Sequence, residues 1–347
     1  INDKNYTALA FEKEFLKMGA GIVRINANFS HHPLRFMKEF KKFLKTNKYD
    51  VIIANATLYS LKQGCEMIIA KQAGVPVRIF HSHTAGGKKS LKTFCGWLIE
   101  RPFCAYKVGH VITSRWACSF VAGGYFFRKQ EFEVIKDSID VSKFHFSQSR
   151  RDAIRNQLGI SNNTIVLGNV GRINYPKNQS FLVSVLYALL RKGVKAELWL
   201  VGSANSEDEE LRKVKDAVQR YGLQDKVHLF GQRTDVNDLL MAMDVFLLPS
   251  FFEGFAIVGI EAECTGIPCV FNDAISQEVA ITPNITFASV AKGIREWEKG
   301  ITKALKFSFQ RNDGAVAIEK AGYSIEASSK RIQQLLLSLT KRRGKNN

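Results

Sequence analysis

The sequence has no run of eighteen or more apolar residues among its 347 positions, so it offers no candidate for a membrane-spanning helix. Cysteine is scarce: six residues are scattered along the chain, with no C-x-x-C motif and no His/Cys cluster at metal-ligand spacing. This pattern argues against a zinc module and a disulfide framework, and it favours buried thiols. With only seven prolines and 24% charged residues, the composition is that of a globular chain long enough for two hydrophobic cores.

Acidic residues are in deficit. The chain has 32 Asp and Glu against 50 Lys and Arg, a net charge of +18, and most of the excess lies in residues 1–145. A basic half indicates an anionic partner, such as nucleic acid, a phosphorylated substrate or an acidic membrane face; a solvated basic surface is the alternative. Because no helix-turn-helix or zinc-finger signature and no interleaving of aromatic and basic residues is present, nucleic acid ranks below lipid and nucleotide phosphate.

Short β-branched runs alternate with helical patterns along the whole chain, for example in "YDVIIAN", "VPVRIFHSH", "TIVLGNVGR", "AELWLVGS" and "VFLLPS". Continuous apolar strands separated by helices predict parallel sheets with helices on both faces. We therefore expect an α/β protein with two doubly wound domains. The expected domains are 1–141 and 163–322, with a polar linker at 142–162 and a last segment, 323–347, made of a helix and a basic tail.

Two glutamates stand in the apolar stretch "LPSFFEGFAIVGIEAECTGIPCV". The pattern predicts a strand, a turn holding Glu253, and a short helix over 256–264 that carries Glu261. Free backbone N–H groups at a helix start can bind an anion. We expect those N–H groups at Gly254, Phe255, Ala256 and Ile257. Glu263 lies about 200° round the helix from Glu261, so we expect it to face solvent.

A second motif, "NVGRINYPKNQSFL", follows another predicted strand. Gly171 allows the backbone to turn close to a ligand, and Arg172 and Lys177 place two cations in one loop before a helix. Two cations at the end of a strand suit a diphosphate, because they can neutralise charge that develops on a leaving group. An ordinary exposed basic loop is the alternative.

These motifs carry a resemblance to a known family. "EGFAIVGIE" is similar to the E-x7-E motif of family 4 retaining glycosyltransferases, and "GRINYPKN" resembles their G-R-x(4)-K-N loop. "FHSHTAG", "DVNDLLMAMDVFLLPSFFEG" and "GYSIEASSKRIQQLL" look like the capsular and exopolysaccharide branch. The resemblance implies the GT-B fold, in which two Rossmann-like domains face each other and the last helix crosses back to the first domain.

The resemblance also implies roles for individual residues. Glu261 would bind the ribose and Glu253 the transferred sugar, while Arg172 and Lys177 would hold the pyrophosphate. His81, at the end of "RIFHSH", would act beside the donor sugar and acceptor, with His83 as a second candidate. Ser203 and Arg233 follow strand ends and would approach the nucleotide.

Some features depart from the family pattern. The given sequence opens at Ile1 on what resembles a later helix, so it is expected to be truncated and to lack the usual first strand and acceptor loop. "KDSID" stands where relatives have Pro-Asn-Gly-Ile-Asp. The motifs for donor chemistry are present.

The sequence thus predicts a cytoplasmic glycosyltransferase of polysaccharide assembly, peripheral on the inner membrane face. It would move a hexose from a UDP- or GDP-sugar to a lipid-linked saccharide with retention. No cofactor or metal is expected, since no D-x-D motif stands at a predicted strand end. The alternatives are a non-catalytic nucleotide-sugar-binding remnant of the same fold and a nucleotide-sugar epimerase. Besides the sugar nucleotide and the acceptor, an anionic membrane surface is the expected partner, through the basic first domain and the tail "KRRGKNN".

Overall fold

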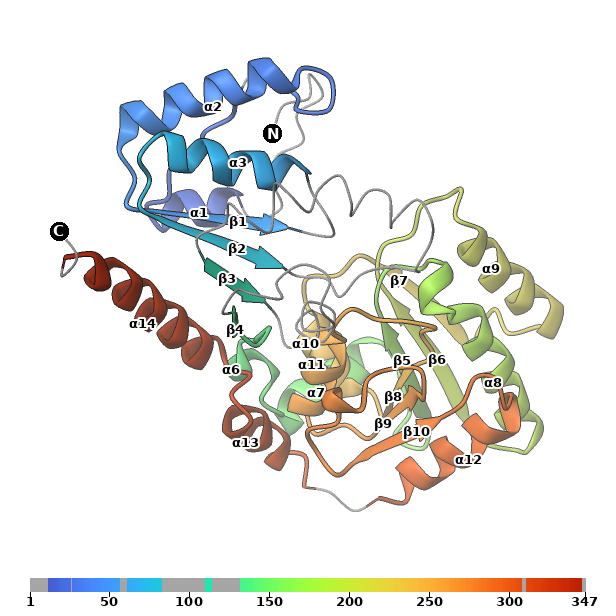
Figure 1. Cartoon of the computed structure of the whole chain (residues 1–347). Helices are drawn as coiled ribbons and strands as arrows, with labels where there is room; N and C mark the ends of the chain where they lie inside the picture. Colours follow the sequence, from blue (N-terminus) through green and yellow to red (C-terminus); the bar gives the residue numbers. More distant parts are fainter. Residues whose placement is uncertain are drawn as a thin grey trace. The chain divides into compact units, whose positions relative to one another are not determined.

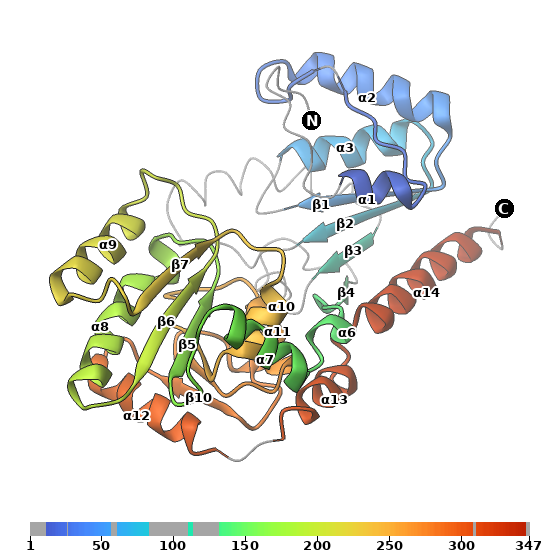
Figure 2. The ribbon, with the colours of Figure 1, turned by 180° about the vertical axis from the view of Figure 1, so that it is seen from behind.

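The computed structural model describes residues 12–25, 27–56, 61–82, 110–113, 132–307 and 310–344 (Figures 1 and 2). The chain divides into two compact units. The first consists of residues 1–135 together with 331–347, and the second of residues 136–330. The last residues of the chain therefore belong to the unit that its beginning forms.

The first unit contains a parallel sheet in the order β1-β2-β3-β4. The strands are β1 (Val51–Ala56), β2 (Val77–Ser82), β3 (His110–Thr113) and β4 (Phe132–Val134). Among the described residues, the helices before and between them are α1 (Glu12–Lys17), α2 (Pro33–Asn47) and α3 (Leu61–Gln72). The last helix, α14 (Ile325–Gly344), places Leu335 in a buried cluster with Val77 and Ile79 of β2. None of the described helices is long and apolar enough to cross a bilayer.

The second unit has a six-stranded parallel sheet in the order β10-β9-β8-β5-β6-β7. Its strands are β5 (Ile165–Val170), β6 (Ala196–Val201), β7 (Val227–Gly231), β8 (Val245–Leu248), β9 (Cys269–Asn272) and β10 (Ile285–Ala288). The helices are α6 (Val141–Phe144), α7 (Gln148–Gln157), α8 (Gln179–Arg191), α9 (Glu209–Tyr221), α10 (Val236–Ala242), α11 (Ile257–Cys264), α12 (Ile294–Leu305) and α13 (Asp313–Lys320).

Each face of this sheet has its own apolar core, because successive side chains of a strand point to opposite faces. In β6, Leu198 and Leu200 pack with residues of α8 and α12, whereas Trp199 and Val201 pack with residues of α10 and α11. Helices therefore cover both faces, and the predicted doubly wound α/β organisation is confirmed for this unit.

The stretch predicted to be a polar linker differs from that expectation. Much of it is helical, in α7, and Arg155 of this helix is buried. The guanidinium of Arg155 donates to the carboxylate of Asp244 and to the carbonyl oxygens of Ala242, Ser161 and Thr164. Since these partners satisfy a buried charge, α7 is an integral part of the second unit.

Candidate functional site

The candidate site lies where the order of the second sheet reverses. From β5 the chain proceeds outward through β6 and β7, and it then returns to β8 on the other side of β5. In doubly wound sheets, ligands bind in the crevice at the carboxyl ends of the two strands that flank such a switch point. The loops that follow β5 and β8 carry the two sequence motifs.

Backbone contacts fix the loop after β5. The Gly171 N–H donates to the Val201 carbonyl at 2.8 Å, and the Ile173 N–H donates to the Ser203 carbonyl at 2.9 Å. A Cβ atom on Gly202 would lie 2.1 Å from the Gly171 carbonyl oxygen, so only glycine allows this close approach. The loop therefore presents Arg172 in one defined place, at the carboxyl end of β5.

Two further hydrogen bonds tie this loop to the one after β8. The Phe251 N–H donates to the Pro176 carbonyl at 2.9 Å. The buried Asn178 side chain donates to the Pro249 carbonyl at 3.4 Å, from a residue with a φ of +54°. These hydrogen bonds hold the two loops together at the carboxyl end of the sheet, although more than seventy residues separate them in the sequence.

A pocket of about 320 Å³ opens at this edge. It is lined by Val170, Gly171, Arg172, Lys177, Val236, Glu253, Phe255, Ala256, Ile257, Val258 and Glu261. The structure thus brings together most of the residues that the two motifs singled out.

Of the two cations that line the pocket, one is paired with a carboxylate and the other is not. The Lys177 ammonium is within 2.7 and 2.8 Å of the two carboxylate oxygens of Glu253. Arg172 is exposed and forms no ion pair with any other residue that the structure describes. An anion that enters the pocket therefore meets a guanidinium without a competing carboxylate.

The start of α11 supplies further donors. Among the described residues, the N–H groups of Gly254, Phe255 and Ala256 have no hydrogen-bond acceptor. The predicted free N–H at Ile257 is wrong. This N–H donates to the Phe255 carbonyl at 2.8 Å, although Ile257 does line the pocket. Val258, which the sequence did not single out, lines the pocket and likewise keeps its N–H unbonded within the described chain.

Glu261 projects from α11 into the pocket and is largely shielded from solvent. Burial raises the pKa of its carboxyl to about 7. At neutral pH this side chain is therefore a mixture of a hydrogen-bond acceptor and a protonated group that can also donate, and both forms can bind a hydroxyl group.

The prediction that Glu263 faces solvent is wrong. Glu263 is fully buried, and its Oε2 accepts hydrogen bonds from the Ile281 N–H, the Thr282 N–H and the Thr282 hydroxyl, at 2.7 to 2.9 Å. Burial raises the pKa of Glu263 to about 8. The helix-angle argument failed because protein surrounds α11 on more than one side: Ile260, Ala262 and Cys264 are buried as well.

The remaining predicted residues lie elsewhere. Ser203 supports the Arg172 loop through its backbone carbonyl and does not line the pocket. Arg233 is exposed and forms a bidentate ion pair with Asp235, in which its Nε and Nη2 atoms lie 2.8 and 2.6 Å from the two carboxylate oxygens. His81 belongs to β2 of the first unit, where it is paired in register with Asn55 and Ile112. His83 lies outside the described residues.

Comparisons with known proteins identify the family of the chain. The family model of glycosyl transferases group 1 matches residues 150–325, just over half of the chain, and this range includes both motifs. EpsF of Bacillus subtilis (strain 168), a protein named as a glycosyltransferase, is 26% identical over 304 residues, which are 85% of this chain and 76% of that protein. The UDP-Gal:α-D-GlcNAc-diphosphoundecaprenol α-1,3-galactosyltransferase of Escherichia coli is 28% identical over 67% of this chain and 60% of its own length.

Solved structures show the same fold. Anabaena HepE, in complex with UDP and glucose, superposes with a TM-score of 0.74 at 21% identity, covering 96% of this chain and 90% of its own. A glycosyltransferase from Rickettsia africae gives a TM-score of 0.78 at 15% identity, over 96% of this chain and 89% of that one. The chain belongs to the glycosyl transferases group 1, and its fold is the GT-B fold of those enzymes.

Proposed function

We propose that the protein transfers a hexose from a UDP- or GDP-sugar to a lipid-linked saccharide in polysaccharide assembly, with retention of anomeric configuration. The observation that carries this proposal is the pocket at the switch point, which unites Arg172, Lys177, Glu253, Glu261 and the start of α11. The name of the E. coli galactosyltransferase supports a lipid diphosphate acceptor. The polysaccharide context rests on the resemblance of the sequence to the capsular and exopolysaccharide branch. Retention rests on the resemblance to the family.

The diphosphate would bind between Arg172, Lys177 and the unbonded N–H groups of Gly254, Phe255, Ala256 and Val258. In transfer, the bond between the anomeric carbon and the diphosphate oxygen breaks, and a bond to the acceptor hydroxyl oxygen forms. The leaving diphosphate gains negative charge and accepts the hydroxyl proton. Donors fixed in advance at that position stabilise the developing charge without further rearrangement.

The two glutamates would hold the neutral parts of the donor. The ionised carboxylate of Glu261 would accept hydrogen bonds from the ribose hydroxyls, and its protonated form could also donate one to them. Glu253 binds hydroxyls of the transferred sugar, so Lys177 is shared between this carboxylate and the diphosphate. Ser203 would act through the loop that it supports, and Arg233 would reach the nucleotide only by leaving Asp235.

The first unit would supply the acceptor side. His81 is our proposed catalytic residue there, on the strength of the family resemblance. The lipid-linked acceptor implies work at the inner face of a membrane from the cytoplasmic side, with an anionic lipid surface as a partner. If vesicle binding showed no dependence on anionic lipid, the anionic lipid surface would be ruled out as a partner.

Calorimetric titration with UDP and with GDP tests the donor site. We expect tight binding of one nucleotide by the wild type, at least tenfold weaker binding by Glu261→Ala, and unchanged binding by the exposed control Glu319→Ala. Binding of neither nucleotide would overturn the proposal. Nucleotide binding without turnover on any lipid-linked saccharide would favour the alternative of a non-catalytic binding protein.

A further inference from the structure

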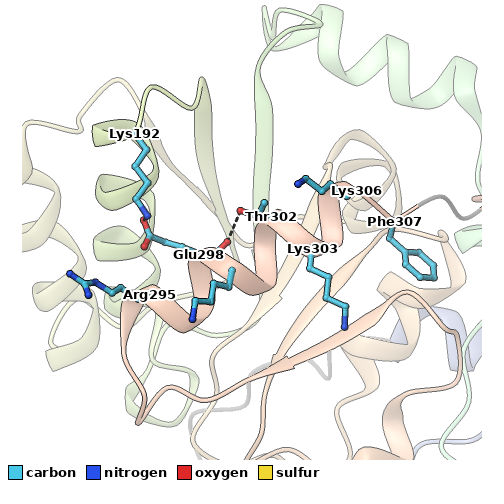
Figure 3. A pocket seen from close by; sticks show the side chains of 8 residues that line it. Lys192, Arg295, Glu298, Thr302, Lys303, Lys306 and Phe307 are labelled. Carbon is cyan, nitrogen blue, oxygen red and sulfur yellow. Dashed lines mark hydrogen bonds and ion pairs between the residues drawn. The ribbon is translucent and has the colours of Figure 1, made fainter.

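A second pocket, of about 660 Å³, lies along the outer side of α12 in the second unit. It is lined by Lys192, Arg295, Glu298, Lys299, Thr302, Lys303, Lys306 and Phe307. Figure 3 shows Arg295, Glu298, Thr302 and Lys303 along α12, with Lys306 and Phe307 just beyond its end. Lys192 reaches Glu298 from the end of α8. We call the set of lining residues the α12 surface. It shares no residue with the pocket at the end of β5.

The cations of the α12 surface lie on one side of the helix. At roughly 100° per residue, Arg295, Lys299, Lys303 and Lys306 fall within an arc of roughly 80°. The opposite side of α12 is apolar and buried: Trp297, Ile301 and Ala304 belong to the sheet core. The helix therefore presents a row of positive charge outward.

Acidic side chains form few ion pairs with this row. Glu296, partly exposed and roughly 20° beyond the edge of the row, forms none with the described residues. Glu298 is the acid of the pocket, and its carboxylate is within 2.8 Å of the Lys192 ammonium. Because the side chain of Glu298 is only 8% exposed, while that of Lys192 is 62% exposed, the pair leaves the outer surface positive. Within the described chain, Arg295, Lys299, Lys303 and Lys306 form no ion pair.

The arrangement suits an extended anionic surface better than a single small anion. From Arg295 to Lys303 the helix rises roughly 12 Å, more than one phosphate can span. All four cations are exposed on flexible stems, so they form no rigid cage. Just beyond the C-terminal end of α12, Phe307 is 40% exposed. Basic residues beside an exposed aromatic residue are typical of helices that lie in a bilayer interface.

We infer that the α12 surface docks on an anionic phospholipid bilayer. The lysines and the arginine contact the lipid phosphates, and Phe307 enters the boundary between headgroups and acyl chains. This inference rests on the proposed use of a lipid-linked acceptor, because docking of the second unit would hold the donor site near the membrane. It places the membrane contact on a surface different from the basic first domain and the tail.

The test is co-sedimentation of the full chain with vesicles of phosphatidylcholine, with and without 30% phosphatidylglycerol. Each basic residue near an anionic surface contributes about a fivefold increase in partitioning. The triple variant Lys299→Gln/Lys303→Gln/Lys306→Gln should therefore partition about 100-fold more weakly onto anionic vesicles. Binding to neutral vesicles should be weak and unchanged.

A matched control removes the same charge from another surface. Arg212, Lys215 and Arg220 of α9 are exposed, and their triple glutamine variant should keep nearly all binding to anionic vesicles. A second variant, Phe307→Ser, should weaken partitioning severalfold and leave its salt dependence unchanged. Titration with UDP or GDP should give the same affinity for all of these variants and the wild type.

Three results would overturn the inference. The triple α12 variant could bind vesicles as well as the wild type does, both triple variants could lose binding equally, or only neutralisation of the tail 341–345 could abolish it. A wild type that prefers a short RNA to anionic vesicles through these same lysines would also contradict a lipid partner. Loss of nucleotide binding would instead count against the proposed function, so the two failures are distinguishable.

Discussion

The Nζ atom of Lys177 donates hydrogen bonds to both carboxylate oxygens of Glu253, at 2.7 and 2.8 Å. The pair connects the loop after β5 to the loop after β8, and both side chains are largely buried. The cation proposed for the diphosphate is thus held by the carboxylate proposed for the sugar. On donor binding, Lys177 would be shared between Glu253 and the diphosphate.

Removal of the Glu253 charge should free Lys177 for phosphate. We expect Glu253→Gln to bind UDP or GDP about fivefold more tightly than the wild type, and Lys177→Gln to bind about 10- to 100-fold more weakly, as for the loss of a charge-assisted hydrogen bond. Transfer activity should fall in both variants. Calorimetry and initial-rate measurements check this, and equal losses of nucleotide affinity in the two variants would contradict it.

Glu261 should make stability depend on pH. Its pKa is about 7 in the folded protein and 4.5 ordinarily, so unfolding releases a proton between these values. The free energy of unfolding should fall as pH rises from about 4.5 to about 7, by at most about 3 kcal/mol and less where solvent screens the group. Glu261→Gln should show a smaller decrease in urea unfolding, because only the part due to Glu263, whose pKa is also raised, remains, whereas Glu319→Gln should retain the full decrease. Parallel curves for wild type and Glu261→Gln would disprove the expectation.

Glu263 should matter for stability and not for nucleotide recognition. Glu263→Ala leaves the N–H groups of Ile281 and Thr282 without their acceptor and opens a cavity, so we expect a loss of about 3 kcal/mol or more. Glu263→Gln keeps an amide oxygen in the same position and resembles the neutral acid, and it should lose only about 1 kcal/mol. Urea unfolding monitors both variants. An equally large loss for Gln and for Ala would show that the neutral isostere cannot replace the carboxyl and would contradict this expectation.

Gly202 should be intolerant of even one added methyl group. Its Cβ would lie 2.1 Å from the Gly171 carbonyl oxygen, and its φ is +147°. Gly222 also has a positive φ, +65°, but a Cβ there would meet nothing within 4 Å. Gly222→Ala should therefore cost about 1 kcal/mol of strain, while Gly202→Ala should cost more and also weaken nucleotide binding by moving Arg172. If both variants bound nucleotide as the wild type does, the Gly171 loop would not depend on this contact.

His81 should affect turnover and not donor affinity. We expect His81→Ala to lower kcat about 100-fold or more, as for the loss of a group in contact with the reacting atoms, with nucleotide affinity unchanged within about twofold. The exposed His145 provides the control substitution. A His81→Ala variant with normal kcat would remove this residue from the mechanism.

The sequence allowed most of the second unit to be predicted, because its strands are continuous apolar runs with clear ends. β10 was missed: "NITFASV" alternates polar and apolar residues, and the strand is only partly buried over most of its length. The helix α7 was taken for a linker because its sequence is polar. Its order comes from the ion pairs and carbonyl contacts of Arg151 and Arg155, which depend on residues about ninety positions away.

The residue types of the candidate site could be predicted from its motifs. The contacts and the burial of those residues depend on the three-dimensional arrangement and could not. The glutamates and the Gly171 loop follow strand ends, so their shared edge could be anticipated. No pattern in the sequence indicates that Lys177 pairs with Glu253, that the Ile257 N–H is already bonded, or that Glu263 is enclosed. Each of these depends on the local turn of the chain and on partners distant in sequence.

The return of the last helix to the first unit has a consequence for biosynthesis. Val77 and Ile79 of β2 complete their cluster only with Leu335 and its neighbours on α14. These residues leave the ribosome after the whole second unit has been made. This side of the first sheet therefore remains without its cover until α14 has been synthesised. During that interval the early strands expose an apolar face, which chaperones have the opportunity to bind.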